Sequence, residues 1–287
     1  MHHILVKYVN YKNLIAPTDV TIQYYSLIKM KTESLFDLTS KVAVVTGGGD
    51  GIGKGCCKIL AAAGASVVVS DLTVEKARTT VDEIVKAGGK AVATACNVLN
   101  EADLTALIDF TVTTYGTVNI LVNNAGLGGG GRENPFKIDR EYVERIYAIN
   151  VFAPWQLCKL AAPHMQKSGF GSIINITSMS SINNDPNMAI YGSSKAALNH
   201  MASNLAFDYG PMGIRINNVG PGATKTHALA TVLTPEIEAK MLAHTPIKRL
   251  GGVADIAGAV LYFAAPVSTW VSGQVLMVNG GGVQTLD

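Results

Sequence analysis

The chain has 287 residues, of which 48% are hydrophobic and 15% charged, and its 23 basic and 21 acidic residues leave a formal charge of +2. This composition can fill a large hydrophobic core and excludes wholesale disorder. The near-neutral balance shows no basic stripe, so nucleic acid is not expected as a partner. With no long apolar run and no evident secretory signal, we expect a cytoplasmic protein without a membrane partner.

Residues 1–35 differ in composition from the rest of the chain. They are rich in tyrosine, lysine and isoleucine, lack glycine, and show neither a helical nor a strand period. We predict an N-terminal extension outside the main fold, of a kind that can be disordered.

From residue 41 onward, short runs rich in valine and isoleucine alternate with longer alanine-rich stretches, a pattern typical of repeated strand–helix units. The predicted strands are 42–45, 66–70, 91–95, 119–122, 172–176, 214–219 and 274–278. The predicted helices lie near 51–63, 74–87, 100–115, 139–167, 191–209 and 253–264. Because the strand runs are nearly continuously apolar, helices should cover both faces of the sheet. We predict one α/β domain over residues 36–287, a doubly wound sheet of seven mainly parallel strands.

The four cysteines, Cys56, Cys57, Cys96 and Cys158, form no CxxC pair, and no histidine stands at metal-ligand spacing from them. Neither a disulfide framework nor a zinc site is predicted. We expect buried free thiols and no bound metal.

A glycine-rich turn, Thr46-Gly47-Gly48-Gly49-Asp50-Gly51-Ile52-Gly53, follows the first predicted strand and opens a helix. Gly47, Gly51 and Gly53 let the backbone turn sharply, approach a pyrophosphate and pack the helix on the strand. Free N–H groups at the start of the helix attract the phosphates. A glycine turn alone is weak evidence, because a purely structural turn looks the same.

Asp71 strengthens the prediction of a dinucleotide site, since it ends the second strand about 20 residues beyond the glycines. A carboxylate there accepts hydrogen bonds from both ribose hydroxyls and repels a 2′-phosphate. Asp50 places no cation in the turn to offset that repulsion, so we expect NAD rather than NADP. The alternative interpretation is that Asp71 caps the following helix.

Three side chains predict the chemistry. Ser178 follows the fifth predicted strand, and Tyr191 and Lys195 lie four residues apart on one helix face. Hydride transfer at a carbinol carbon needs a group that exchanges the hydroxyl proton, but a free phenol, with a pKa near 10, is a poor base. We expect Lys195 to lower the pKa of Tyr191 and to donate to the nicotinamide ribose, and Ser178 to bind the substrate oxygen. Singly, each residue would equally serve packing, solvation or a turn.

Together, TGGGDGIG, NNAG, the serine with Tyr-x-x-x-Lys and a late Pro-Gly turn resemble the short-chain dehydrogenase/reductase family from about Leu35 to the C-terminus. The resemblance implies a Rossmann-like fold, hydride transfer between NAD and a secondary alcohol or ketone, and a homotetramer. It implies that Tyr191 is the catalytic acid/base, Lys195 its partner and Ser178 the ligand of the substrate oxygen. Asn150 is implied to kink its helix and hold a water against Lys195, although an ordinary buried amide is the alternative.

The resemblance also implies the residues that bind the cofactor. They are Gly47, Gly51, Ile52, Gly53, Asp71, Leu72, Asn97, Val98, Asn124, Gly126, Tyr191, Lys195, Gly222, Thr224 and Thr226. The segment 123–126 is implied to support the sheet and line the adenine ribose, and Thr226 to hold the nicotinamide carboxamide. Asn97 departs from the aspartate common in the family, but its amide oxygen can still accept a hydrogen bond from the adenine amine.

Within the family, residues 175–179, 234–238, 244–247 and 280–284 are similar to bacterial NAD-dependent 7α-hydroxysteroid dehydrogenases. This implies a bile-acid-type steroid as substrate, surrounded by Gly128, Ser178, Asn183 and Tyr191, with Asn183 bonding a hydroxyl. The segment 226–244 carries enough apolar side chains to close over the steroid rings, and would equally serve helix packing.

There are two alternatives, one a reductase of the same family and the other from a different functional class. A 3-oxoacyl carrier reductase usually draws on NADPH, so Asp71 argues against it. A catalytically idle NAD-binding protein would not need Ser178, Tyr191, Lys195 and Asn150 intact. The long alanine-rich helices predicted at 139–167 and 191–209 favour packing against copies of the chain.

Overall fold

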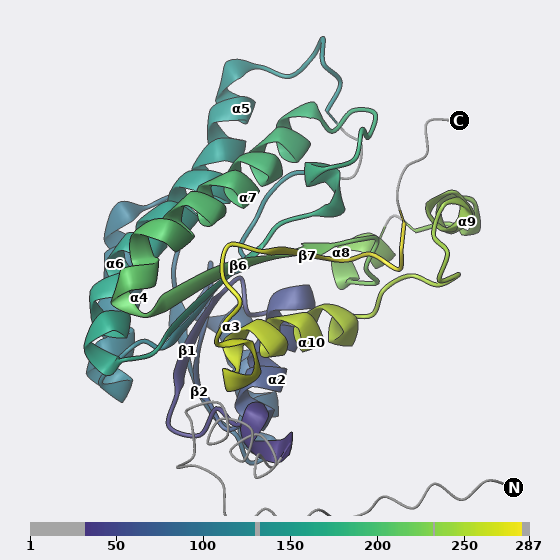
Figure 1. Ribbon diagram of the computed structural model, residues 1–287. Helices are drawn as coiled ribbons and strands as arrows, with labels where there is room; N and C mark the ends of the chain where they lie inside the picture. Colours follow the sequence, from purple (N-terminus) through teal and green to yellow (C-terminus); the bar gives the residue numbers. More distant parts are fainter. Residues whose placement is uncertain (1–31, 130–132, 232, 283–287) are drawn as a thin grey trace, which may run out of the picture. The chain divides into compact units, whose positions relative to one another are not determined.

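The computed structural model describes residues 32–129, 133–231 and 233–282 (Figure 1). The chain divides into two compact units, Met1–Leu35 and Phe36–Asp287. Only the 3₁₀ turn η1 (Thr32–Leu35) of the first unit is described. The predicted character of residues 1–31 therefore lies outside the described residues.

In the described part of the second unit, seven strands form one sheet in the order β3-β2-β1-β4-β5-β6-β7. They are β1 (Val42–Thr46), β2 (Ser66–Asp71), β3 (Lys90–Ala95), β4 (Ile120–Asn123), β5 (Gly171–Ile176), β6 (Ile214–Pro221) and β7 (Val275–Val278). Every neighbouring pair is parallel. The predicted doubly wound sheet is confirmed, and its strand order reverses between β1 and β4, where such folds bind ligands.

Helices cover both faces of this sheet (Figure 1). One face packs against α2 (Gly51–Ala62), α3 (Val74–Lys86) and α10 (Val253–Ala264), and the other against α4 (Glu101–Tyr115), α6 (Ala153–Ser168) and α7 (Ala189–Tyr209). Each face has its own hydrophobic core, and successive strand residues point into opposite cores. Val45 packs in the first core, with α2, α3 and α10, and Val44 in the second, with α4, α6 and α7. This double coverage explains why the strands lack an alternating polar pattern.

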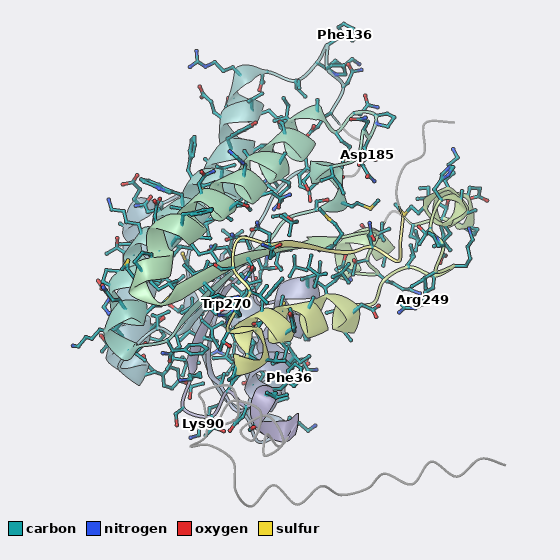
Figure 2. The ribbon with its side chains drawn as sticks, viewed as in Figure 1. Phe36, Lys90, Phe136, Asp185, Arg249 and Trp270 are labelled. Atoms are coloured by element: carbon teal, nitrogen blue, oxygen red, sulfur yellow. The ribbon has the colours of Figure 1, made fainter. Side chains whose placement is uncertain are left out.

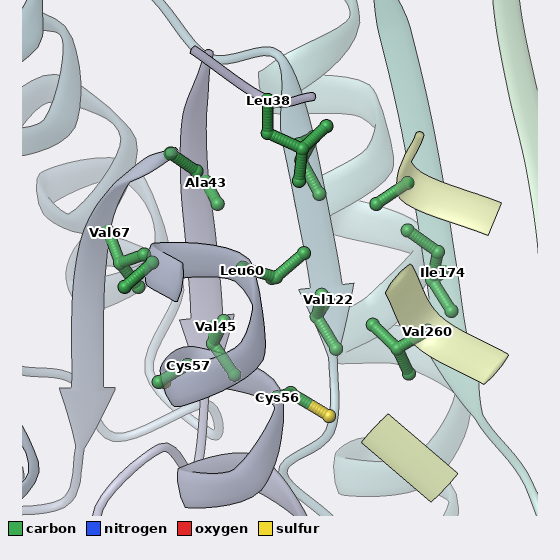
Figure 3. Packing of buried hydrophobic residues seen from close by; sticks show 14 of the residues in the cluster. Leu38, Ala43, Val45, Cys56, Cys57, Leu60, Val67, Val122, Ile174 and Val260 are labelled. Carbon is green, nitrogen blue, oxygen red and sulfur yellow. The ribbon is translucent and has the colours of Figure 1, made fainter. Parts of the chain in front are cut away.

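The first core contains two of the four cysteines. Figure 3 shows Cys56 and Cys57 of α2 packed with Val45 and Val122 of the sheet. All four cysteines are buried and free, as predicted. Burial raises the pKa of the Cys56 and Cys158 thiols to about 12, so neither is a thiolate nucleophile at neutral pH.

The long helix predicted near 139–167 is interrupted. It consists of α5 (Arg140–Tyr147), the π-helical turn η2 (Ala148–Phe152) and α6, with Pro154 in the first turn of α6. Apolar periodicity continues through the interruption, so the sequence pattern alone does not reveal the wider turn. Such π-helical turns often occur at functional sites.

The segment after β6 contains two short helices, α8 (His227–Ala230) and α9 (Pro235–Ala243), that the sequence pattern did not predict. Thr226 caps α8 and Thr234 caps α9 through their side-chain oxygens. The remaining 3₁₀ turns are η3 (Met179–Ser181), η4 (Gly210–Met212) and η5 (Pro266–Ser268). Within the described residues, no helix combines the length and apolarity needed to cross a membrane.

Candidate active site

A cavity of about 920 Å³ lies at the carboxyl ends of the central strands. Its wall contains most of the predicted site residues: Gly51, Ile52, Asn124, Gly126, Gly128, Ser178, Tyr191, Lys195, Gly222, Thr224 and Thr226. Asp185 and Arg249, labelled in Figure 2, also line it. Because parallel strands place their carboxyl ends at one edge, loops distant in sequence meet here.

The other predicted site residues lie outside this wall: Gly47, Gly53, Asp71, Leu72, Asn97, Val98, Asn150 and Asn183. Asp71, Leu72, Asn97 and Val98 lie where β2 and β3 end. Asp71 pairs in register with Ala95, Leu72 follows Asp71, and Asn97 and Val98 come shortly after Ala95. The predicted cofactor residues thus divide between the cavity and the neighbouring strand ends, as an extended dinucleotide would require.

The glycine turn has a backbone conformation that favours glycine and is bound by the side chain of Asn124. Gly47 and Gly51 have φ values of 62° and 53°, in the left-handed region that favours glycine. The amide of Asn124 donates to the carbonyl oxygens of Thr46 (2.9 Å) and Gly47 (3.0 Å). A Cβ on Gly53 would collide with the Gly47 oxygen and the Asn124 amide nitrogen. Only glycine therefore lets α2 begin so close to the end of β1.

The side chain of Asp71 is hydrogen-bonded to this turn. Its Oδ2 accepts a hydrogen bond from the Gly49 backbone at 3.0 Å, and its Oδ1 accepts one from Leu72 at 2.8 Å. The cap of the following helix α3 is Thr73, so the alternative interpretation of Asp71 as that cap is wrong. None of the ion pairs formed by the described residues includes Asp71.

Asn97 lies in a tight local turn after β3. Its Oδ1 accepts from the Leu99 backbone at 3.1 Å, and its own N–H donates to Asp103 Oδ2 at 2.9 Å. The amide oxygen predicted to accept from adenine therefore already has one local partner and retains its second lone pair.

Tyr191 and Lys195 lie on one face of α7, as their spacing predicts. Lys195 is 4% exposed, and its Nζ donates to the Ile176 oxygen at 2.9 Å and lies 5.8 Å from the centre of the Tyr191 ring. Burial lowers the pKa of Lys195 to about 8. A Cβ on Gly126 would lie 3.3 Å from this Nζ and 3.4 Å from Asn150 Oδ1, so both polar groups face the same glycine.

The structure does not show the predicted lowering of the Tyr191 pKa by Lys195. Burial raises the pKa of Tyr191, the side-chain hydrogen bond with Ser178 opposes the rise, and the charge of Glu133 adds to it. The physical reason is that a nearly enclosed phenol loses the hydration that would stabilise its anion. Ser178 is therefore the protein group that favours the phenolate.

Asn150 lies inside the π-helical turn η2 and is completely buried. Its Nδ2 donates to the Leu127 oxygen at 2.8 Å and to Ser194 Oγ at 3.0 Å, and its Oδ1 accepts from the Leu127 N–H at 3.0 Å. Asn150 thus ties the loop after β4 to both η2 and α7. Its role in holding a water against Lys195 stays a prediction.

Two predicted substrate residues differ in their surroundings. Gly128 has a φ of 97°, and a Cβ there would lie 3.0 Å from Tyr191 Cδ2, so this glycine packs against the Tyr191 ring. Asn183 follows η3, and its buried Nδ2 has no hydrogen-bond partner among the described residues. A buried amide donor without a partner is costly, which is consistent with a ligand oxygen completing it.

Sequence reasoning missed a ladder of asparagines across the sheet. Asn123, Asn175 and Asn218 are in register on β4, β5 and β6, and their side chains are joined by hydrogen bonds of 2.8 and 2.9 Å. The Asn218 side chain donates to the backbone oxygen of Asn199 in α7. The Asn199 side chain in turn donates to Ser181 Oγ at 2.7 Å. The recurrence of asparagine near the ends of three apolar strands was the available signal.

Glu133, in the loop between β4 and α5, was also missed, because nothing in the local sequence separates it from a solvated loop charge. It is 1% exposed and accepts hydrogen bonds from the first turn of α7. Among the residues that the structure describes, no group of three or more His, Cys, Asp or Glu side chains could hold a metal ion.

Comparison with known proteins bears on this arrangement. A family model described as Enoyl-(Acyl carrier protein) reductase matches residues 47–282. A 7α-hydroxysteroid dehydrogenase of Escherichia coli (strain K12) is 50% identical over 250 residues, covering 87% of this chain and 97% of that protein. Another, from Clostridium sardiniense, is 35% identical over 253 residues, covering 85% and 94%.

One solved structure, of a 7α-hydroxysteroid dehydrogenase complexed with NADH and 7-oxo glycochenodeoxycholic acid, is similar to this chain with a TM-score of 0.85. The two are 49% identical, and the similarity covers 90% of this chain and 100% of that one. The likeness therefore extends over the whole of that protein.

Proposed function

Because the chain belongs to the short-chain dehydrogenase/reductase family, as its motifs predicted, we propose that it oxidises the 7α-hydroxyl of bile-acid-type steroids to a ketone with NAD, and catalyses the reverse reduction. One observation supports the reaction class: Ser178, Tyr191, Lys195 and residues of the glycine turn line the same cavity. The similarity to 7α-hydroxysteroid dehydrogenases supports the steroid.

The residues present fit NAD. A side chain at Gly53 would collide with the Gly47 oxygen, so only glycine keeps the N-terminus of α2, which attracts phosphates, against the end of β1. Asp71, without an ion-pair partner among the described residues, suits the ribose hydroxyls and repels a 2′-phosphate. Thr226 and Lys195 line the cavity where the nicotinamide end belongs. The chemistry that bound NAD would supply to this site is that of an acceptor for the hydride of the alcohol carbon.

The chain supplies the proton chemistry. Ser178 holds the substrate oxygen beside Tyr191, which takes the hydroxyl proton during oxidation and returns it during reduction. Since burial raises the pKa of Tyr191, the phenol is protonated at neutral pH and is ready to donate. The Ser178 hydroxyl favours the phenolate that oxidation needs. Oxidation is therefore expected to accelerate as pH rises.

The cavity also suits a flat apolar substrate. Leu229 of α8 and Met241 and Leu242 of α9 line it together with Tyr191. The segment predicted to close over the steroid thus contributes apolar side chains to the cavity. Asn183 lies outside the cavity wall, and its role in bonding a steroid hydroxyl rests on the resemblance and on its buried amide donor without a partner among the described residues.

A homotetramer is part of the proposal. Phe152, Trp155 and Phe207 are 59%, 45% and 85% exposed on η2, α6 and α7, and Trp270 is 100% exposed before β7, the edge strand of the sheet. Large exposed aromatic side chains on these elements favour contact between copies of the chain, and the tetramer is the assembly that we propose. Light scattering of the wild type and of Phe207→Glu tests this. The cytoplasm stays the predicted compartment.

The experiment that tests the function is turnover of the purified full chain with cholate and NAD. We expect NADH formation at 340 nm together with a 7-oxo product by mass spectrometry, and a rate at least about 10-fold lower with NADP. If another alcohol is oxidised while cholate is not, the steroid assignment is wrong. Reduction of a 3-oxoacyl thioester with NADPH as the better reaction would favour the acyl reductase instead.

A further inference from the structure

The N–H groups in the first turn of α7, the helix that carries Tyr191 and Lys195, donate to a residue distant in sequence. At the N-cap position of α7 stands Met188, whose thioether replaces the hydroxyl, amide or carboxylate usual there. The first N–H groups of a helix have no partner within the helix. Here the Ile190 N–H donates to Glu133 Oε2 at 2.8 Å, and the Tyr191 N–H donates to both oxygens of Glu133 at 3.0 and 3.1 Å.

The carboxylate of Glu133 is enclosed by neutral donors. Its Oε1 also accepts from the Tyr142 hydroxyl at 2.9 Å, and its backbone N–H donates to the Asn187 oxygen at 3.0 Å. None of the ion pairs among the described residues includes Glu133. Burying a carboxylate is costly, and here hydrogen bonds and the positive end of the α7 dipole offset that cost.

The loop that holds the Tyr191 backbone also contacts its ring. A Cβ on Gly128 would lie 3.0 Å from Tyr191 Cδ2, and one on Gly129 would lie 3.4 Å from Tyr191 Cε1. The same loop lines the substrate cavity through Leu127, Gly128 and Gly129. A displacement of the loop would therefore shift the phenol relative to the substrate.

We propose that Glu133 is a positioning residue for the dehydrogenase reaction: it joins the substrate loop after β4 to the first turn of α7 and so sets where the Tyr191 hydroxyl stands. The proposal rests on the proposed function only in taking Tyr191 as the acid/base. It concerns any alcohol the enzyme oxidises, whether or not that alcohol is a steroid.

Position and charge have separate consequences. The charge of Glu133 opposes ionisation of Tyr191, whereas the Ser178 hydroxyl favours it. Lys195 lies on the same helix, and Tyr142 of α5 contacts Glu133. The other ionisable residues of the cavity wall are Asp50, Asp185, Lys240, His244, Arg249 and Asp255. Removing the Glu133 charge should thus lower the pH at which oxidation becomes active, and displacing the tyrosine should lower the rate at the high-pH plateau.

The test compares Glu133→Gln, Glu133→Asp and Tyr142→Phe with the wild type, using kcat for alcohol oxidation from pH 7 upward to the highest pH at which the folded protein is retained, because burial raises the pKa of Tyr191 above that of a free phenol. For Glu133→Gln we expect a plateau kcat at least about 10-fold lower and a midpoint about 0.5 pH unit lower, with NADH affinity within about two-fold. Glu133→Asp, which keeps the charge, should restore the midpoint. Tyr142→Phe removes a donor from the carboxylate, so its midpoint should move to higher pH.

The matched control is Glu144→Gln, the same carboxylate-to-amide change at an exposed residue. Glu144 of α5 pairs with Arg140 Nε at 2.6 Å, and both side chains are exposed. This variant should move neither the plateau nor the pH profile. A wild type that oxidises no alcohol would defeat the proposed function. An active wild type whose plateau and midpoint are unchanged in Glu133→Gln would overturn the role of Glu133. Should that variant not fold, an unshifted midpoint in Tyr142→Phe would overturn it.

Discussion

Lys195→Met tests whether burial of the Lys195 ammonium in the candidate active site lowers the free energy of unfolding. Lys195 is 4% exposed, and burial alone accounts for the fall of its pKa from 10.5 to about 8. A difference of about 2.5 units corresponds to roughly 3 kcal/mol against the buried ammonium at neutral pH. Methionine has a similar stem and no charge, but it leaves the Ile176 oxygen without the donor that now lies 2.9 Å away.

These two effects oppose each other at pH 7, so the dependence on pH is the decisive quantity. Between about pH 8 and 10.5 the unfolded wild type keeps a proton on Lys195 that the folded protein has released. The free energy of unfolding of the wild type therefore rises relative to the variant by about 1.4 kcal/mol per pH unit in this window, and the rise is lost as pH falls through 8. All other ionisable groups are common to both proteins and cancel.

The assay is urea unfolding of both proteins at pH 7, 8, 9 and 10, at one protein concentration because self-association would change the apparent stability. The matched control is Lys90→Met, since Lys90 is exposed at the start of β3 (Figure 2) and its loss removes no buried charge. If the difference between wild type and Lys195→Met stays constant from pH 7 to 10, burial of the ammonium does not carry the cost assigned to it.

Three further outcomes follow from the same geometry. Tyr191→Phe should lower kcat at least about 100-fold while NADH affinity, measured by fluorescence, stays within about two-fold, and a retained rate would remove its acid/base role. Asp71→Asn keeps the size of the side chain but removes its charge, so the ratio of kcat/KM for NADP to that for NAD should rise about 10-fold; an unchanged ratio would contradict the cofactor assignment. Gly53→Ala should cost about 2 kcal/mol or more in unfolding free energy and weaken NADH binding, because its Cβ meets the Gly47 oxygen. Gly258→Ala, in α10 with nothing within 4 Å, should be neutral or stabilising by up to about 1 kcal/mol, and equal losses in both variants would refute the steric reason.

Local pattern was sufficient for the elements of the sheet. Continuous apolar runs such as 42–46 and 66–71 require cover on both faces, which in a chain of alternating strands and helices means a parallel, doubly wound sheet. The glycine turn and Asp71 predicted the cofactor because each depends on a few adjacent residues. The spacing of Tyr191 and Lys195 predicted their shared helix face for the same reason.

Contacts between distant segments were not readable in this way. The register that aligns Asn123, Asn175 and Asn218 is set by strand pairing, and the π-helical turn around Asn150 is stabilised by its hydrogen bonds to Leu127 and Ser194. The ladder had a weak signal in the recurrence of asparagine at strand ends, but pairing and register depend on the whole sheet.

The amino-acid sequence by itself determined the fold class and the cofactor and predicted the candidate reacting side chains, because periodicity and short motifs are properties of neighbouring residues. Only the tertiary structure decided how strongly those side chains hold their protons, since burial depends on everything packed around them. It raised the pKa of Tyr191 where the sequence predicted a fall, and it brought Glu133 to the start of the helix on which Tyr191 lies.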